Sequence, residues 1–233
     1  RIEVKGQFPR TGSNQFIGRE VVSYAAERDL VPDDGAPLTM GIDVARFGDD
    51  ESVFRFRRGR DARSIKPMRF RGKDTMALAS EAATAIERLK PEAVFVDGGG
   101  VGGGVVDRLK MLGYRVIEVQ SGEKARDEEK YLNRRAEMWA EMRDWLVYGA
   151  IDNDEALIDD LTGPEYALHL KGQIKLESKD SMKKRGLSSP DDGDALALTF
   201  AEPVSRMDAA TARRMNRMRG ETASSEYDIF AST

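Results

Sequence analysis

The chain has 233 residues, 40% of them hydrophobic and 33% charged, which suits one globular domain of about 150–200 residues with appendages and excludes a collagen, a mucin or a fully disordered chain. No stretch approaches the roughly 18 uncharged apolar residues of a membrane-spanning helix, and no apolar run follows a charged start as in a signal peptide. The sequence contains no cysteine, which excludes thiolate chemistry. The formal net charge is −4, so the overall charge does not indicate a nucleic-acid partner.

The first 37 residues read as a linker. They combine turn-forming residues with one short amphipathic helix near 18–28, and they end in a break rich in Pro, Asp and Gly at 32–37. The chain starts with Arg rather than Met, so we expect it to be a piece of a longer protein.

Three antiparallel strands are predicted next. Residues 38–45 form an apolar run, residues 51–58 alternate Phe with Arg, and residues 63–71 follow a turn, with Pro67 demoting this third strand to an edge or a bulge. A helix at 73–89, a strand at 92–97, a helix at 105–112 and a strand at 114–119 then alternate in the way that builds parallel sheet. We therefore predict an α/β fold with a central mixed sheet, three antiparallel strands followed by parallel strands, flanked by helices.

The remaining elements are a helix at 133–148, a helix at 154–162, a hairpin of 166–170 with 173–176, and a last helix at 192–200. Trp139 and Trp145 share the apolar stripe of the first of these helices, which favours core anchors over base-stacking platforms. The folded domain is expected to span 38–203, with 204–233 as a flexible tail. His169, on the hairpin and away from every candidate acid, is interpreted as structural.

Three acids lie at the margins of buried elements. Asp43 stands inside an apolar strand, Asp97 ends another, and Asp194 heads the apolar run of the last helix, with Asp191 one turn before it. An ionised carboxylate in apolar surroundings needs a cation or strong hydrogen-bond donors. Together these acids predict an oxygen-ligand site for Mg²⁺ or Mn²⁺. For each acid alone, a helix N-cap or a strand-end turn remains the alternative, most of all for Asp194.

The order of elements resembles the ribonuclease H-like fold, and four motifs make the resemblance specific. They are GIDVARFGDDESV at 41–53, VFVDGGGVGGGVVDRL at 94–109, YLNRRAEMW at 131–139 and ESKDSMKKRGLSSPDDGDALAL at 177–198. Together they resemble the C-terminal nuclease domain of phage terminase large subunits, which package and cut viral DNA. The segment at 4–17 resembles the stretch that leaves the N-terminal ATPase domain of such proteins.

The resemblance implies a metal-dependent endonuclease that cuts concatemeric double-stranded DNA. Its metal ligands carry over to Asp43, Asp97 and Asp194, with Asp49 and Asp191 as less secure accessory acids. It implies hydrolysis with two Mg²⁺ or Mn²⁺ ions, one lowering the pKa of the attacking water and the other stabilising the leaving 3′ oxygen. Asp43 would then bridge both ions.

The glycines after Asp97 match a second motif. Gly98, Gly100 and Gly103 fit G-x-G-x-x-G, which alone predicts a dinucleotide site. An acid beside the pyrophosphate and three antiparallel strands before the motif count against that site. We favour glycines that let a DNA backbone or a metal-bound phosphate approach Asp97, with a plain flexible turn as the alternative.

Basic residues cluster in two places. Nine Lys or Arg and one acid lie between Arg55 and Lys73, and strand alternation predicts that Arg55 and Arg57 point away from the core. We expect Arg55, Arg57 and Arg58 to contact DNA phosphates, although solvated strand charges are the default for any single Arg. A second group, expected to hold the cut strand near the metals, comprises Lys179, Lys183, Lys184 and Arg185.

Two rival functions stay open. One is a junction resolvase or integrase of the same fold, and the other is a non-catalytic module that docks DNA or a portal ring. No G-x-x-x-x-G-K-[ST] motif occurs, so ATP hydrolysis is expected in the N-terminal ATPase domain instead. The other partners implied by the resemblance are the portal and the small terminase subunit, with no membrane, in the cytoplasm of an infected bacterial host.

Overall fold

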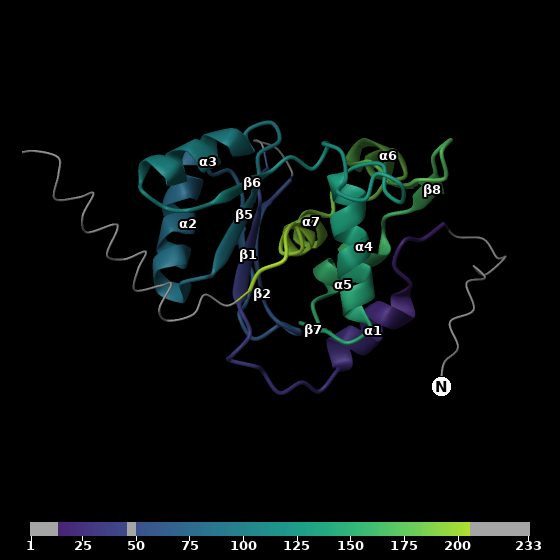
Figure 1. Cartoon of the computed structure of the whole chain (residues 1–233), viewed down its shortest axis with the longest axis horizontal. Helices are drawn as coiled ribbons and strands as arrows, with labels where there is room; N and C mark the ends of the chain where they lie inside the picture. The colour runs from purple at the N-terminus through teal and green to yellow at the C-terminus, as the bar shows by residue number, and fades with distance from the viewer. Residues whose placement is uncertain (1–13, 46–49, 206–233) are drawn as a thin grey trace, which may run out of the picture.

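The structure is a computed structural model that describes residues 14–45 and 50–205, and it places a mixed sheet between two layers of helices (Figure 1). The strands are β1 (Leu38–Asp43), β2 (Ser52–Arg58), β3 (Asp61–Ala62), β4 (Met68–Phe70), β5 (Ala93–Asp97), β6 (Ile117–Val119), β7 (Ala150–Ile151), β8 (Tyr166–Leu168) and β9 (Ile174–Leu176). The helices are α1 (Arg19–Glu27), α2 (Thr75–Leu89), α3 (Gly102–Met111), α4 (Arg134–Leu146), α5 (Glu155–Thr162), α6 (Lys179–Lys184) and α7 (Asp191–Leu198).

The strand order of the main sheet is β6-β5-β1-β2-β3-β7, and β4 also pairs with β2. β1 and β2 are antiparallel, whereas β5 and β6 continue the sheet parallel to β1. The predicted mixed sheet flanked by helices is therefore confirmed. The third antiparallel strand is divided in two, because β3 pairs with one end of β2 and β4 with the other. Pro67, which has no backbone N–H to donate to a ladder, directly precedes β4.

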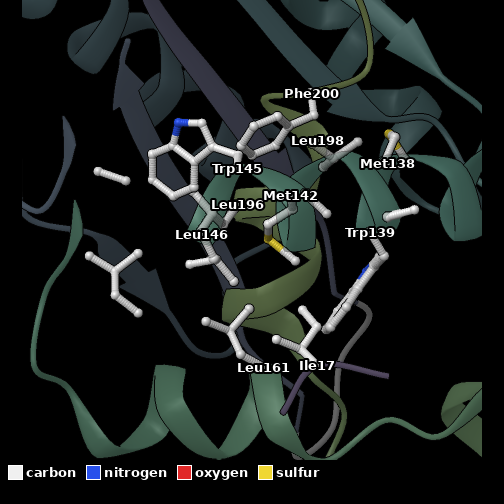
Figure 2. Packing of buried hydrophobic residues seen from close by; sticks show 14 of the residues in the cluster. Ile17, Met138, Trp139, Met142, Trp145, Leu146, Leu161, Leu196, Leu198 and Phe200 are labelled. Atoms are coloured by element: carbon white, nitrogen blue, oxygen red, sulfur yellow. The ribbon is translucent and has the colours of Figure 1, made fainter. Parts of the chain in front are cut away.

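Each face of the sheet has its own hydrophobic core. Phe54 and Phe56 of β2 lie in the core under α2 and α3. On the other face, α4 packs its Trp139, Met142 and Trp145 against the apolar residues of α7 (Figure 2). Both tryptophans are buried, so their prediction as core anchors is confirmed. The sheet is thus covered on both sides, as is usual for parallel strands linked by helices.

Gly41 allows α7 to lie directly against β1. A Cβ atom at Gly41 would stand only 2.0 Å from the backbone oxygen of Ala195 in α7, so a larger residue would push the helix off the strand. Side chains alternate along a strand, and Asp43 therefore faces the same side of the sheet as Gly41. This close approach brings the first turns of α7 beside the end of β1.

Part of the expected linker belongs to the domain core. Phe16 and Ile17 are buried, and α1 buries Val22, Ala25 and Ala26 against the same cluster as α4 and α7. The expectation of a linker over these residues is wrong, because the apolar side of the short helix packs onto α5 and β7. The rest of the expected linker at 1–13 and most of the expected tail, 206–233, lie outside the described residues. Among the helices of the described ranges, none has the length and apolar character to cross a membrane.

Candidate metal centre

Three carboxylates from two elements meet at the end of β1. Asp43 is the last residue of β1, and α7 contributes Asp191 and Asp194 from its first turn. Residues three apart on a helix share a face, so both α7 acids point to the same side. All three residues are buried.

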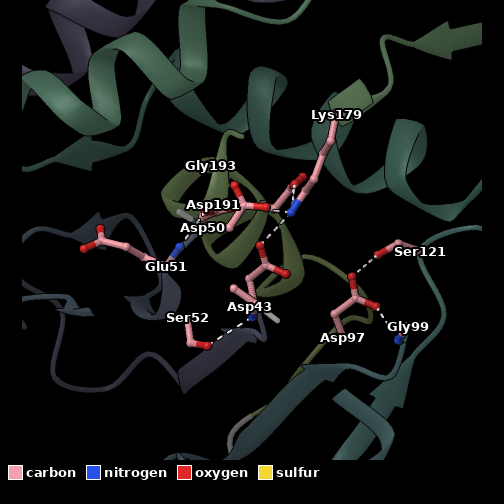
Figure 3. A network of polar contacts seen from close by, with 12 residues as sticks. Asp43, Asp50, Glu51, Ser52, Asp97, Gly99, Ser121, Lys179, Asp191 and Gly193 are labelled. Atoms are coloured by element: carbon pink, nitrogen blue, oxygen red, sulfur yellow. Dashed lines mark hydrogen bonds and ion pairs between the residues drawn. The ribbon is translucent and has the colours of Figure 1, made fainter. Parts of the chain in front are cut away.

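The ammonium group of Lys179 lies among these carboxylates (Figure 3). Its Nζ is 3.0 Å from Asp43 Oδ2, 3.2 Å from Asp191 Oδ1 and 3.2 Å from Asp194 Oδ2. Lys179 is the first residue of α6, a short helix whose N-cap is the side chain of Ser178. The acids therefore surround one positive atom supplied by the chain itself.

The acids of this group differ in how readily they ionise. Burial raises the pKa of Asp43 to about 7, and the charges of Asp194 and Asp191 add to the rise although Lys179 opposes it. Burial also raises the pKa of Asp191. Burial acts on Asp194 in the same sense, but the cations Arg135 and Lys179 outweigh it and hold the pKa of Asp194 below its usual range. The ionised form of Asp43 is thus poorly stabilised by the protein, and a bound cation would lower the pKa of this carboxyl.

Asp194 is held by two further donors from α4. Arg135 Nε donates to its Oδ1 at 2.8 Å and Arg135 Nη2 to its Oδ2 at 3.3 Å, while the indole Nε1 of Trp139 donates to Oδ1 at 2.7 Å. Residues four apart on α4 lie on one face, which explains why both reach the same carboxylate. The expected N-cap alternative for Asp194 does not describe it, since the N-cap position of α7 is Pro190.

Asp97 lies beside the cluster at the end of β5. Its charge is close enough to contribute to the raised pKa of Asp43. Its own oxygens accept from the backbone N–H of Gly99 at 2.9 Å and from Ser121 Oγ at 3.0 Å (Figure 3). The glycine run also serves packing here, because a Cβ at Gly102 would lie 1.8 Å from the carbonyl oxygen of Asp97. Only glycine lets α3 begin against this strand end.

The donor set suits a divalent cation, although the side chains do not form a metal site as they stand. Within residues 14–45 and 50–205, no three acidic or histidine side chains are arranged to hold a metal ion. Lys179 Nζ occupies the position where the three carboxylates converge, and Asp97 is turned toward Gly99 and Ser121. Carboxylate oxygens are the ligands that Mg²⁺ and Mn²⁺ prefer, and this set already binds one cation. The residue types therefore suit a divalent cation, and Lys179 and Asp97 would have to move for one to bind.

The remaining expected acid, Asp49, lies outside the described residues. The two residues that follow it, Asp50 and Glu51, contact α6 and α7. Asp50 accepts from Lys183 Nζ at 2.9 Å, and the backbone N–H of Glu51 donates to Asp191 Oδ2 at 3.0 Å. The start of β2 is thus tied to both α6 and α7.

The expectation that Arg55 and Arg57 point away from the core is wrong. They do lie on the face opposite Phe54 and Phe56, but α7 covers that face. Arg55 is 1% exposed and pairs with Asp152 and Asp192 at 2.6 and 2.5 Å. Alternation along a strand separates two faces but does not reveal whether the second face is also covered. A side chain enclosed in this way is not available to a DNA phosphate.

The other two arginines are also engaged with the protein. Arg57 Nη2 donates to the backbone oxygen of Thr199 at 2.6 Å, and its guanidinium lies 4.1 Å from the ring centre of Phe200. Arg58, half-buried, donates to the backbone oxygens of Asp34 and Ala36.

The second basic group is better exposed. Lys183, Lys184 and Arg185 are all exposed at the end of α6. Arg185 binds Glu177 and Glu165, while Lys183 binds Asp50. His169 lies in the turn after β8, where its backbone N–H donates to Gln173 at 2.7 Å, a placement that agrees with a structural role.

Two contacts of the site were not predicted from the sequence. They are the hydrogen bonds that Arg135 and the indole of Trp139 donate to Asp194. The signal available was their i, i+4 spacing in the YLNRRAEMW motif. It gives a shared helix face but not the carboxylate that this face meets 55 residues later in the chain.

One curated protein and several solved structures are similar to the chain. No family model matches the chain. The "Probable terminase, large subunit" of Enterobacteria phage P7 is 26% identical over 209 residues, which cover 83% of this chain and 42% of that protein. The chain thus spans less than half the length of this curated relative.

Solved structures share the fold. The nuclease domain of the large terminase subunit gp2 of bacterial virus Sf6 matches with a TM-score of 0.71 and 18% identity over 83% of this chain and all of that one. A K428A variant of that domain with manganese and beta-thujaplicinol gives a TM-score of 0.72, 19% identity and the same coverage. The large terminase nuclease from thermophilic phage G20c with bound magnesium gives 0.56 and 16% identity over 73% of this chain and 84% of that one.

The resemblance inferred from the motifs is confirmed by both comparisons. The chain is similar to a phage terminase large subunit and shares the ribonuclease H-like fold of solved large terminase nuclease domains.

Proposed function

We propose that the chain is the nuclease domain of a viral DNA-packaging terminase large subunit and that it cuts concatemeric double-stranded DNA by metal-dependent phosphodiester hydrolysis. The observation that carries this proposal is the convergence of Asp43, Asp191 and Asp194 on the ammonium group of Lys179. Burying several carboxylates together lowers the stability of a fold, and such a loss of stability is typical of functional sites.

The metal ligands proposed are Asp43, Asp97, Asp191 and Asp194, with Asp49 as an additional candidate. When bound, two Mg²⁺ or Mn²⁺ ions would lower the pKa of an attacking water and stabilise charge on the leaving oxygen. Asp43, whose pKa is raised by burial and by the charges of Asp194, Asp191 and Asp97, is the candidate to hold both ions. Arg135 and Trp139 hold Asp194 ionised and in place.

The exposed basic residues of α6 are the proposed DNA contacts beside the metals. Lys183 and Lys184 follow Lys179 on the same short helix, and Arg185 is the C-cap residue of that helix, so a DNA strand lying over the acids would pass them. Arg55 is withdrawn from the DNA-binding proposal because it is enclosed under α7. Arg57 and Arg58 are half-buried, so they rank below the exposed basic residues as DNA contacts.

The proposed partners follow from the relatives. Solved neighbours carry manganese or magnesium and are named as large terminase nucleases, which supports a divalent metal here. The match covers 42% of the curated relative, and the proposed N-terminal ATPase domain would correspond to part of the remaining length. Portal and small terminase subunit, in the cytoplasm of an infected bacterial host, complete the proposal.

Incubation of the purified chain with supercoiled plasmid tests the proposal. We expect nicked and linear DNA to form with Mn²⁺ or Mg²⁺, and no cutting with excess EDTA or with Ca²⁺, whose looser coordination does not align the attacking water. DNA binding without any cutting over a wide Mn²⁺ range would support the docking module instead. A strong preference for four-way junctions over linear duplex would favour a resolvase.

A further inference from the structure

The guanidinium of Arg135 connects two parts of the acid cluster. Its Nε and Nη2 bind the two oxygens of Asp194, and its Nη1 donates to the backbone oxygen of Glu177 at 2.7 Å. Glu177 precedes by two residues the Lys179 whose ammonium lies among the carboxylates. One planar side chain therefore spans α4, α7 and the segment that leads into α6.

The geometry fixes Asp194 more tightly than a simple ion pair does. A guanidinium that binds both oxygens of a carboxylate sets its orientation as well as its charge. Trp139 Nε1 supports the same oxygen that receives Arg135 Nε. Asp194 Oδ2 is left directed toward Lys179 Nζ, 3.2 Å away.

We propose that Arg135 is a positioning residue, which presents Asp194 Oδ2 to a bound metal and holds the start of α6 beside it. This inference rests on the proposed function, because it assigns a residue to the metal centre of that function. Arg135 is not itself a ligand, since a guanidinium offers no lone pair to a cation.

A positioning role and a charge-neutralising role predict opposite effects. If Arg135 only offset the negative charge of the acids, its removal would make the cluster more negative and strengthen Mn²⁺ binding. If it positions Asp194, its removal lets the carboxylate turn away and weakens Mn²⁺ binding. The sign of the change therefore separates the two roles.

The first measurement is the Mn²⁺ affinity of the chain with Arg135→Gln, by calorimetric titration. We expect a 10- to 100-fold loss, the usual effect of removing a hydrogen-bond partner of a metal ligand. Arg134→Gln is the matched control, because its side chain is 12% exposed against 13% for Arg135 and it pairs with Glu137 instead. Unchanged or tighter Mn²⁺ binding by Arg135→Gln overturns the proposal, as does an equal loss in the control.

Arg135→Lys keeps the positive charge and is the milder variant if Arg135→Gln does not fold. Lysine cannot grip both carboxylate oxygens and the Glu177 carbonyl at once. We expect its Mn²⁺ affinity to fall as well. If a folded Arg135→Lys chain binds Mn²⁺ as tightly as wild type does, only the charge of residue 135 matters. That result would overturn the proposal that Arg135 positions Asp194.

Metal-free crystal structures of the two glutamine variants, or of Arg135→Lys in place of an unfolded one, give a readout independent of metal binding. We expect the Asp194 carboxylate to leave its contact with Lys179 when Arg135 is replaced and to keep it in Arg134→Gln. An unmoved Asp194 overturns the proposal. A wild-type chain that binds no Mn²⁺ would defeat the proposed function, while these structures would still decide whether Arg135 positions Asp194.

Discussion

Lys179 Nζ lies 3.0 Å from Asp43 Oδ2, although 136 residues separate the two in the chain. The contact joins the start of α6 to the end of β1. Because Asp191 and Asp194 bind the same ammonium, Lys179 supplies positive charge to all three carboxylates, as a bound metal ion would.

Replacing Lys179 by Ala is expected to strengthen Mn²⁺ binding by about 10-fold, because a competing cation is removed. DNA cutting is expected to fall in the same variant, since a positive charge beside the cut phosphate is lost. Calorimetry and single-turnover cleavage measure the two effects. Lys175→Ala, an exposed lysine of β9, is the control and should change neither; weaker Mn²⁺ binding by Lys179→Ala would argue against competition.

Arg55 is expected to be a major contributor to stability. Its replacement by Met leaves the buried carboxylate of Asp152 without its guanidinium and leaves Asp192 with that of Arg69 alone, and breaking a buried ion pair costs about 3–5 kcal/mol. Urea unfolding measures the loss. Arg71→Met is the matched control, because Arg71 is 74% exposed where it pairs with Glu51 and should cost less than about 1 kcal/mol. Equal stability of the two variants would refute the buried network.

Gly41→Ala is expected to disturb the site from within the sheet. The new Cβ would collide with the Ala195 backbone oxygen, so α7 must move away from β1 and carry Asp194 with it. We expect a loss of about 1–3 kcal/mol in unfolding free energy together with weaker Mn²⁺ binding. At Gly122 a Cβ would meet nothing within 4 Å, and Gly122→Ala should leave the metal affinity as it is. A Gly41→Ala chain with wild-type metal affinity would contradict the role given to this close approach.

Asp160 of α5 is expected to make stability depend on pH. Its Oδ2 accepts from the backbone N–H groups of Asp192 and Gly193 at 2.8 and 3.2 Å, and burial raises its pKa to about 8. The folded chain therefore binds this proton more tightly than the unfolded chain does, so the stabilising contribution of Asp160 is present in full at acidic pH and is lost as pH rises toward 8.

The test is urea unfolding at pH 5 and pH 8 with EDTA present. Asp160→Asn keeps an oxygen acceptor and cannot ionise, so wild type should lose about 3 kcal/mol more than this variant between the two pH values. Asp159→Asn, an exposed neighbour on α5, should behave as wild type. The account of Asp160 fails if its variant shows the same pH dependence as wild type.

The acids of the site could be predicted because burial of a carboxylate is costly and therefore conspicuous. Asp43 and Asp97 stood out as charges in apolar strands, and Asp194 as the acid that heads an apolar helix. Their meeting depended on α7 lying against Gly41, a tertiary contact that no local pattern encodes.

The errors have the same origin. The alternation of Arg55 with Phe was read correctly as two faces, but α7, 136 residues further on, covers the second one. Arg135 was not singled out from the sequence, because its partner, Asp194, lies 59 residues away. The short strand β7 and the short helix α6 carry too few residues for a periodic signal.

The central claim is that the acids at the end of β1, on α7 and at the end of β5 carry out metal-dependent DNA cleavage. Its most direct test is single-turnover cutting of plasmid in Mn²⁺ by Asp43→Asn, Asp97→Asn and Asp194→Asn, each compared with Asp107→Asn, an exposed acid of α3. Each of the three changes removes the charge of a ligand and keeps its shape, so we expect at least about 100-fold slower cutting by folded protein and wild-type cutting by the control. Wild-type cutting by all three variants would contradict the claim.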